Sequence, residues 1–224
     1  GDSTAPGPSG DQGAAYVFHR AGTVWTFDQE LKGSGTGERN GFAVALEDGV
    51  ATVGAPLAMA HTNPAQGRVN PYTYNGTNWV AEPPLTPAGG IPGEHFGSSV
   101  DIDGATLVAG SPTRRVSGRT NQGAAYVFVL SEGRWAEQHT LIAGDGAINA
   151  AFGTSVAVDG DIALVGAPLH DPGGVSDQGS AYVFTRTGTA WTQSLRLNAT
   201  DGEAGDGFGR VLAMARGVAA VGVP

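Results

Sequence analysis

The side chains best suited to binding chemistry stand in three short stretches, each just after a Gly-x-Pro triplet of the chain. One stretch holds three arginines within six residues, in a protein of formal net charge −9. Guanidinium groups bind carboxylates and other anions through paired hydrogen bonds. The candidate ligand-binding residues of the three stretches are His61; Arg114, Arg115 and Arg119; and His170, Asp171 and Asp177. Surface loops also vary without any function, so that simpler interpretation stays open.

A fourth group is acidic and could hold a metal. Asp201, Glu203 and Asp206 place three carboxylates within six residues. Calcium takes six or more oxygen ligands, and a loop of this kind could supply some of them. The spacing does not match an EF-hand loop, and Asp is also common in turns, where it bonds its own backbone. Turn chemistry is the simpler interpretation, and we expect no cofactor other than this calcium.

The common enzyme motifs are missing from the sequence. Its single lysine, Lys32, is not part of a Gly-Lys-Ser/Thr triplet, which excludes a P-loop. There is no Gly-x-Ser-x-Gly elbow, and the five histidines lack the spacing of a zinc site. The sequence therefore predicts that this chain is not an enzyme, although a longer parent protein could be one.

These candidates are carried by a repeat that is written four times. In every copy, Gln-Gly is followed 13 residues after its Gln by Trp, and the copy ends in Gly-x-Pro. The copies span approximately 1–56, 57–112, 113–168 and 169–224 of one region. A period of this length, with one supersecondary unit per copy, is typical of propellers and solenoids.

Each copy is predicted to form four short strands. In the third copy, the aromatic and β-branched run 124–128 precedes a strand at Trp135. Two further strands follow around Asp159-Gly160, which is a strong hairpin signal. With 37 glycines and no sustained helical periodicity, the chain is expected to be all-β. Four-stranded antiparallel units that repeat radially are the blades of a β-propeller, and the repeated Trp is expected to pack between blades.

Two recurring motifs resemble a known repeat. Phe152-Gly153 at the start of one strand and Gly166-Ala167-Pro168 at the end of the next resemble the FG-GAP repeat, the blade unit of integrin α-subunit heads and of many secreted or surface bacterial proteins. The resemblance covers the whole chain, although the first copy reads Gly41-Phe42. It implies a β-propeller, usually of seven blades. The calcium loops of many such blades are not expected here, because turns such as Asp103-Gly104 are too short.

The resemblance also implies a role. It predicts a non-catalytic binding or adhesion module, extracellular or at the cell surface, that presents a protein or glycan ligand on its long inter-strand loops. The alternative is the substrate- or partner-docking propeller of a larger secreted enzyme, and a structural spacer is a third reading. The sequence pI of about 4.8 argues against nucleic acid and anionic membranes, which need a basic face. No apolar run is long enough for membrane insertion.

Strand order decides where the loops lie and how the ring could close. The second-to-third and fourth-to-first connections share one face and are the longer ones, so binding is expected there. The chain begins with the third and fourth strands of a blade and ends with a first and second. A closed four-bladed ring would join these halves, whereas a piece of a larger ring would leave strand edges open to self-association. Because the chain starts with Gly1, we expect a processed product or a piece of a longer protein.

Overall fold

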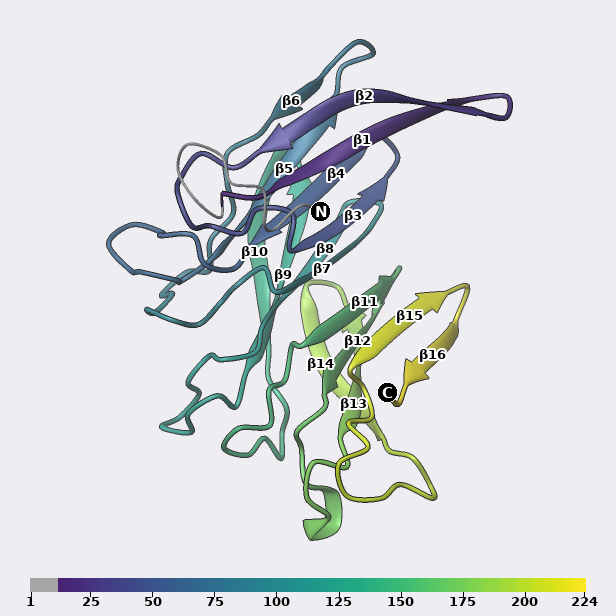
Figure 1. Ribbon diagram of the computed structural model, residues 1–224. Coiled ribbons are helices and arrows are strands. Elements are labelled where there is room, and N and C mark those ends of the chain that lie inside the picture. Colours follow the sequence, from purple (N-terminus) through teal and green to yellow (C-terminus); the bar gives the residue numbers. More distant parts are fainter. Residues whose placement is uncertain (1–11) are drawn as a thin grey trace.

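The computed structural model describes residues 12–224, which are built almost entirely of β-strands (Figure 1). The strands are β1 (Ala14–Ala21), β2 (Val24–Lys32), β3 (Ala43–Glu47), β4 (Val50–Ala55), β5 (Arg68–Tyr74), β6 (Trp79–Ala81), β7 (Ser99–Asp103), β8 (Thr106–Ser111), β9 (Ala124–Ser131), β10 (Arg134–Leu141), β11 (Ser155–Asp159), β12 (Ile162–Ala167), β13 (Ser180–Thr187), β14 (Ala190–Leu197), β15 (Val211–Ala215) and β16 (Val218–Gly222). Within this part of the chain, the one helical element is the 3-10 turn η1 (Pro172–Gly174). No helix in it has the length and apolarity needed to cross a membrane. The all-β prediction is confirmed.

The strands form three complete blades and two half-blades. The complete sheets have the orders β3-β4-β5-β6, β7-β8-β9-β10 and β11-β12-β13-β14, and all their pairings are antiparallel. The hairpins β1-β2 and β15-β16 are separate two-stranded sheets at the two ends of the row. Figure 1 shows the two end hairpins well apart. The blade architecture of a propeller is confirmed, and across residues 12–224 the ring stays open.

Glycines explain why the Phe-Gly and Gly-x-Pro motifs recur together. Gly153 has φ 92°, in the left-handed region that favours glycine, and its N–H donates to the Gly166 carbonyl of its own blade at 2.9 Å. Its own carbonyl oxygen lies against Gly110 of the preceding blade, so closely that a Cβ on Gly110 would collide with it. The same arrangement joins Gly54 to Gly97 and Gly166 to Gly209. The two motifs are therefore the two sides of one close contact between neighbouring blades.

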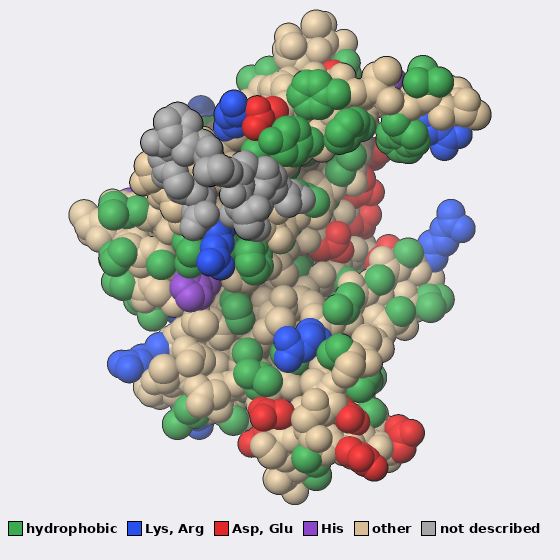
Figure 2. Space-filling view, viewed as in Figure 1, with side chains coloured by type: hydrophobic (Ala, Val, Ile, Leu, Met, Phe, Trp, Pro, Cys, Tyr) green, Lys and Arg blue, Asp and Glu red, His purple; other side chains and the backbone are tan. Residues whose placement is uncertain are grey.

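Apolar side chains fill the space between the blades. Trp191 is 4% exposed and belongs to one buried cluster with Val108 of the preceding blade and Phe152 of its own. Its indole N–H donates to Gln138 of the preceding blade at 2.9 Å. Trp25 occupies the same repeat position in the first copy but is 64% exposed, since the described chain has no blade before it. Figure 2 shows apolar side chains gathered on the surface of this β1-β2 hairpin. The predicted packing of the tryptophans between blades is confirmed where a preceding blade exists.

The first copy departs from the motif by a paired substitution. In the second and third copies the motif phenylalanine packs edge-on against a tyrosine of the third strand of its blade, as Phe96 does against Tyr126 at 5.5 Å between ring centroids. Asn40 stands at the phenylalanine position and is fully buried. Its Oδ1 accepts a hydrogen bond from Asn70, which stands at the tyrosine position, at 2.8 Å. An amide pair thus replaces an aromatic pair, and Phe42 is left half exposed.

Pro71 lies inside a sheet, although prolines in sheets are usually confined to edge strands, strand starts and bulges. It sits in β5, between β4 and β6, opposite Thr52. Its carbonyl accepts from the Glu82 N–H at 2.9 Å, so its missing N–H faces the outer strand rather than β4. The outer strand β6 ends at Ala81, and pairing resumes only as an isolated bridge between Val69 and Leu85. The proline therefore shortens the outermost strand of its blade.

Carboxylates link the short turns of consecutive blades. In each complete blade, the last residue of the first strand accepts a hydrogen bond from the turn glycine of the next blade. Asp103 accepts in this way from the Gly160 N–H at 2.5 Å. Glu47 and Asp159 make the same bond to the next glycines, Gly104 and Gly217, at 2.7 Å each. The three carboxylate residues Glu47, Asp103 and Asp159 line a recess of about 310 Å³ at the short-turn face. The series ends in the last copy, where this position holds Ala215.

Candidate ligand-binding face

The long connections between the second and third strands have identical bases. The N–H of the glycine before the third strand donates to a carbonyl at the start of each loop: Gly67 to Ala58, Gly123 to Arg114, and Gly179 to His170, at 2.9, 3.0 and 2.9 Å. Each glycine also forms an isolated parallel β-bridge to the connection that leads into the next blade. The pairs are Gly67 with Phe96, Gly123 with Phe152, and Gly179 with Phe208. The long loops therefore stand on one face and are held in the same way (Figure 1).

The tips above these bases differ in chemistry. The first tip carries Met59, 62% exposed, beside the exposed His61. The second carries Arg115 and Arg119, which are both exposed, and the Arg115 guanidinium lies 3.5 Å from the Thr120 hydroxyl. A cationic tip is thus flanked by an apolar and histidine-bearing tip and by an acidic one.

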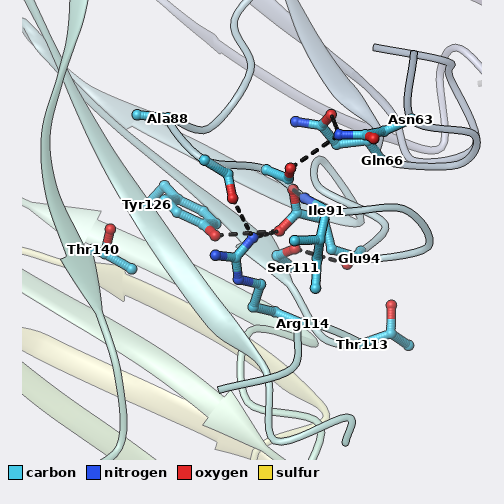
Figure 3. A network of polar contacts seen from close by, with 12 residues as sticks. Asn63, Gln66, Ala88, Ile91, Glu94, Ser111, Thr113, Arg114, Tyr126 and Thr140 are labelled. Carbon is cyan, nitrogen blue, oxygen red and sulfur yellow. Dashed lines mark hydrogen bonds and ion pairs between the residues drawn. The ribbon is translucent and has the colours of Figure 1, made fainter. Parts of the chain in front are cut away.

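Arg114 turns away from this tip and into the protein (Figure 3). Its Nη1 donates to Oε2 of Glu94 at 2.7 Å, and the Glu94 side chain is fully buried. Glu94 also accepts from the Ile91 N–H at 3.0 Å and from the Tyr126 hydroxyl at 3.3 Å. The three arginines predicted as one anion site are therefore divided, because Arg114 already has an anionic partner.

Burial controls the electrostatics of this network. Loss of solvent raises the pKa of Glu94, and its hydrogen bond and charge interaction with Arg114 offset part of that rise. Burial also raises the pKa of Tyr126, and the Glu94 charge adds to the rise. The tyrosine is therefore a neutral donor to the Glu94 carboxylate.

The preceding blade has the same carboxylate and takes its cation from elsewhere. Glu38 lies 56 residues before Glu94 and is also buried. Its two oxygens accept from Nη2 of Arg68 at 2.8 and 2.6 Å. Arg68 stands on β5, whereas Arg114 stands in a second-to-third loop. The carboxylate position is thus constant, and the guanidinium reaches it from different parts of the two blades.

His170 lies in a third polar network and is buried, with 5% of its surface exposed. Its Nδ1 lies 2.8 Å from the Ser180 hydroxyl, and its Nε2 lies 3.9 Å from Asp145. Arg196 also pairs with Asp145. Burial lowers the pKa of His170, which the nearby Asp145 partly offsets. This predicted ligand residue faces the interior rather than the loop tip.

The two predicted aspartates of the third tip close their own loop. Asp171 accepts a hydrogen bond from the Asp177 N–H at 2.7 Å, across the turn η1. Asp177 has φ 51° and is exposed. The structure thus brings these two exposed residues together at the loop, whereas the neighbouring His170 side chain is buried.

The acidic loop repeats a bond made by Glu94. Asp206 stands 112 residues after Glu94, which is twice the repeat length, and its Oδ2 accepts from the Glu203 N–H at 2.8 Å. Glu94 accepts from the N–H of Ile91 in the same way. Throughout residues 12–224, no group of three or more His, Cys, Asp or Glu side chains is placed to hold a metal ion. Asp201 and Glu203 are exposed in the same loop.

Two features escaped the sequence analysis. The buried carboxylates Glu38 and Glu94 were signalled only by their spacing of one repeat length. A groove beside Trp135, at the outer rim between the first and second complete blades, had no signal in the repeat itself. Its cause is the proline-rich segment that interrupts the outer strand after Ala81.

A known repeat family matches the sequence of this chain. Residues 79–128, 135–184 and 191–224 match the FG-GAP repeat, and together they make up more than half of the chain. The chain belongs to the FG-GAP repeat family. The Phe-Gly and Gly-x-Pro motifs of this chain form the inter-blade glycine contact described above.

The FG-GAP chain is also similar to individual proteins. It is 30% identical to integrin alpha-2 of Mus musculus over 178 residues, which cover 70% of this chain and 14% of the integrin. Two solved structures, from Bacteroides uniformis and Bacteroides fragilis, are each named as a "putative 6-phosphogluconolactonase" and have TM-scores of 0.51 and 0.52 at 12% and 10% identity. The matches cover 82% and 92% of this chain, and 49% and 55% of those chains. The FG-GAP chain therefore spans about half of these structures and a small part of the integrin.

The sequence-based prediction that the chain is not an enzyme is wrong. Two structures that share its fold carry the name of an enzyme. The argument had excluded only P-loops, nucleophile elbows and zinc sites, and an enzyme built on a propeller needs none of them. At 10–12% identity the likeness shows the fold alone and assigns no activity.

Proposed function

We propose that this FG-GAP propeller segment is an extracellular or cell-surface binding module that recognises a protein or glycan ligand with its long-loop face. The observation that carries this proposal is the set of three loops with identical bases and different tips. A rigid base with variable, exposed tips is the arrangement by which many scaffolds carry binding residues. The similarity to integrin alpha-2 supports a role in adhesion.

Anionic groups are the ligand chemistry that the middle tip favours. Arg115 and Arg119 make no ion pair in the described part of the chain, whereas Arg114 is engaged by Glu94. Their guanidinium groups are therefore available to a carboxylate or sulfate on a protein or glycan. The acidic residues Asp171 and Asp177 on the next tip would disfavour ligands with extended negative charge.

A binding screen tests the proposal. The purified chain is applied to arrays of extracellular-matrix proteins and of sialylated and sulfated glycans, beside the double variant Arg115→Gln/Arg119→Gln. The matched control is Arg20→Gln, which removes one exposed arginine near the short turn at Gly22. We expect binding that the double variant weakens by at least about tenfold and the control retains. Binding that the control and the double variant weaken equally would contradict a site at the long-loop tips.

A second candidate is the docking propeller of a larger secreted enzyme. It is supported by the small share of integrin alpha-2 that the chain covers and by the enzyme name carried by proteins of the same fold. A catalytic domain encoded beside this chain would favour the docking role. Further FG-GAP repeats there would favour the adhesion role.

A further inference from the structure

A groove runs along the outer rim between the first and second complete blades. It consists of two adjoining hollows of about 510 and 430 Å³, and both are lined by Pro84, Leu85 and Trp135. Small-ligand sites typically enclose about 300–1,000 Å³ and combine apolar surface with a few polar groups. The groove begins at Gly133 and Arg134, next to a short turn, and reaches His61 at the first loop tip.

The groove exists because one outer strand is short. β6 has three residues, whereas the outer strands β10 and β14 of the other complete blades each have eight. Pro71 removes the donor that would extend its pairing, and Pro83 and Pro84 remove two more. The segment after Ala81 therefore leaves the sheet, and Trp135 of the next blade is only partly buried, whereas Trp191 at the same repeat position is 4% exposed.

Trp135 has an unused hydrogen-bond donor. The indole N–H of Trp79 donates to Asp28 at 3.1 Å, and that of Trp191 donates to Gln138 at 2.9 Å. Both acceptors stand three residues after the Trp of the preceding copy. For Trp135 that position is Glu82, where the outer strand has already ended, and within residues 12–224 its indole N–H has no partner. Trp135 thus offers the groove a partly exposed aromatic ring and a free donor.

The opposite wall offers acceptors. The carbonyls of Pro83, Pro84 and Thr86 accept no hydrogen bond in the described part of the chain, and the two prolines have no N–H to offer. An added β-strand could not pair with such a wall, and a proline-rich peptide would bring it no donors. The first hollow combines the carboxylate of Glu82 with the guanidinium of Arg134. In the second hollow, which also holds His61, the Glu137 carboxylate already accepts a hydrogen bond from the Ala88 N–H at 2.7 Å. Neither hollow gathers several charges of one sign, which favours a neutral ligand that both donates and accepts.

We propose that this rim groove is a binding site for a neutral saccharide, with one sugar ring on the face of Trp135. Hydroxyl groups can donate to the free carbonyls and accept from the Trp135 indole N–H at once. The apolar face of a pyranose ring matches the aromatic surface. Apart from His61 at one end of the groove, this site shares no residue with the loop tips of the proposed function, and it does not depend on Arg115 or Arg119.

The indole N–H signals of the tryptophans test this proposal directly. The ¹⁵N-labelled chain is titrated with maltose, cellobiose, lactose and N,N′-diacetylchitobiose, each to about 10 mM, roughly ten times a millimolar dissociation constant. Signals are assigned with single Trp→Phe variants. We expect at least one disaccharide to shift the Trp135 signal saturably and to leave those of Trp79 and Trp191 in place. Trp135→Phe should weaken binding by about tenfold, which one lost hydrogen bond explains.

Three controls keep the result interpretable. Trp79→Phe, at the same repeat position one blade earlier, should retain binding. The variant Arg115→Gln/Arg119→Gln should also retain it, which separates this site from the loop tips. Decaproline is the competing ligand class, and a shift caused by it alone would assign the groove to a peptide. No saturable shift of the Trp135 signal with any of the four sugars would overturn the proposal, and that measurement needs no variant to fold.

Discussion

Glu94 and Arg114 form a buried ion pair, with Nη1 2.7 Å from Oε2, that joins the loop before one blade to the long loop within it. Glu94→Ala leaves the guanidinium, whose side chain is only 21% exposed, without its anion. We expect a loss of about 3 kcal/mol in the free energy of unfolding, as for other broken buried pairs. Urea denaturation measures it, with the exposed Glu132→Ala as the control. The double variant Glu94→Met/Arg114→Met should recover most of the loss, and equal losses in all three variants would argue against a specific pair.

The same carboxylate should leave a signature in the pH dependence of stability. Burial raises the folded-state pKa of Glu94 above the ordinary value of 4.5. Between these two values the folded chain holds a proton that the unfolded chain has released, so stability from this group falls as pH rises through that window. The stability difference between the wild type and Glu94→Gln should therefore decrease as pH rises from 4.5. A difference that grows over this range would contradict the assigned direction.

The inter-blade glycine contact predicts a position-dependent effect of one substitution. Gly110→Ala would push a methyl group into the Gly153 carbonyl of the next blade, at a cost of about 2–3 kcal/mol. Gly222 holds the same motif position in the last copy, where a Cβ would come no closer than 3.4 Å to Val211. Gly222→Ala should therefore change stability by less than about 0.5 kcal/mol. Thermal melting of both variants checks this, and equal effects would show that the motif acts within a blade instead.

The carboxylate link between Asp103 and Gly160 should protect one amide. Asp103→Ala removes the acceptor of the Gly160 N–H, which we expect to cost about 1 kcal/mol of local stability. Native-state hydrogen exchange at Gly160 should then accelerate by roughly fivefold. The Gly217 amide, bonded to Asp159, is the internal control and should exchange at its original rate. Unchanged exchange at Gly160 would mean that the link does not persist in solution.

We propose that the open edges of β1 and β16 drive self-association. In complete blades the equivalent strands pair with Gly110 opposite Ala125, so Gly222 of one copy should pair with Ala15 of another. Light scattering should give a mass above 22.6 kDa that rises with concentration. Val218→Lys, on the edge strand at a residue 71% exposed, should weaken association, and Thr77→Lys should not. A compact monomer at every concentration would instead indicate that the ring closes on itself.

The repeat made the fold predictable, and the breaks in the repeat made the site unpredictable. Strand pattern and period predicted the blades, because the same glycines make the same close contact between neighbouring blades in successive copies. Arg114 points into the protein because it pairs with Glu94, a carboxylate 20 residues away in the sequence that only the folded loops bring close. The Trp135 groove arises from Pro71, Pro83 and Pro84, each ordinary by itself in a sequence with 13 prolines. Such effects need the register of two strands, which local sequence does not contain.

The blades straddle the sequence repeats: each complete sheet takes its first two strands from one copy and its last two from the next. Duplication or deletion of one 56-residue copy would therefore leave the same two half-blades at the ends. Rings of different size could arise from one ancestor by unequal recombination, because the terminal hairpins β1-β2 and β15-β16 would stay complementary to each other. The number of blades becomes a variable that a gene can change in single steps.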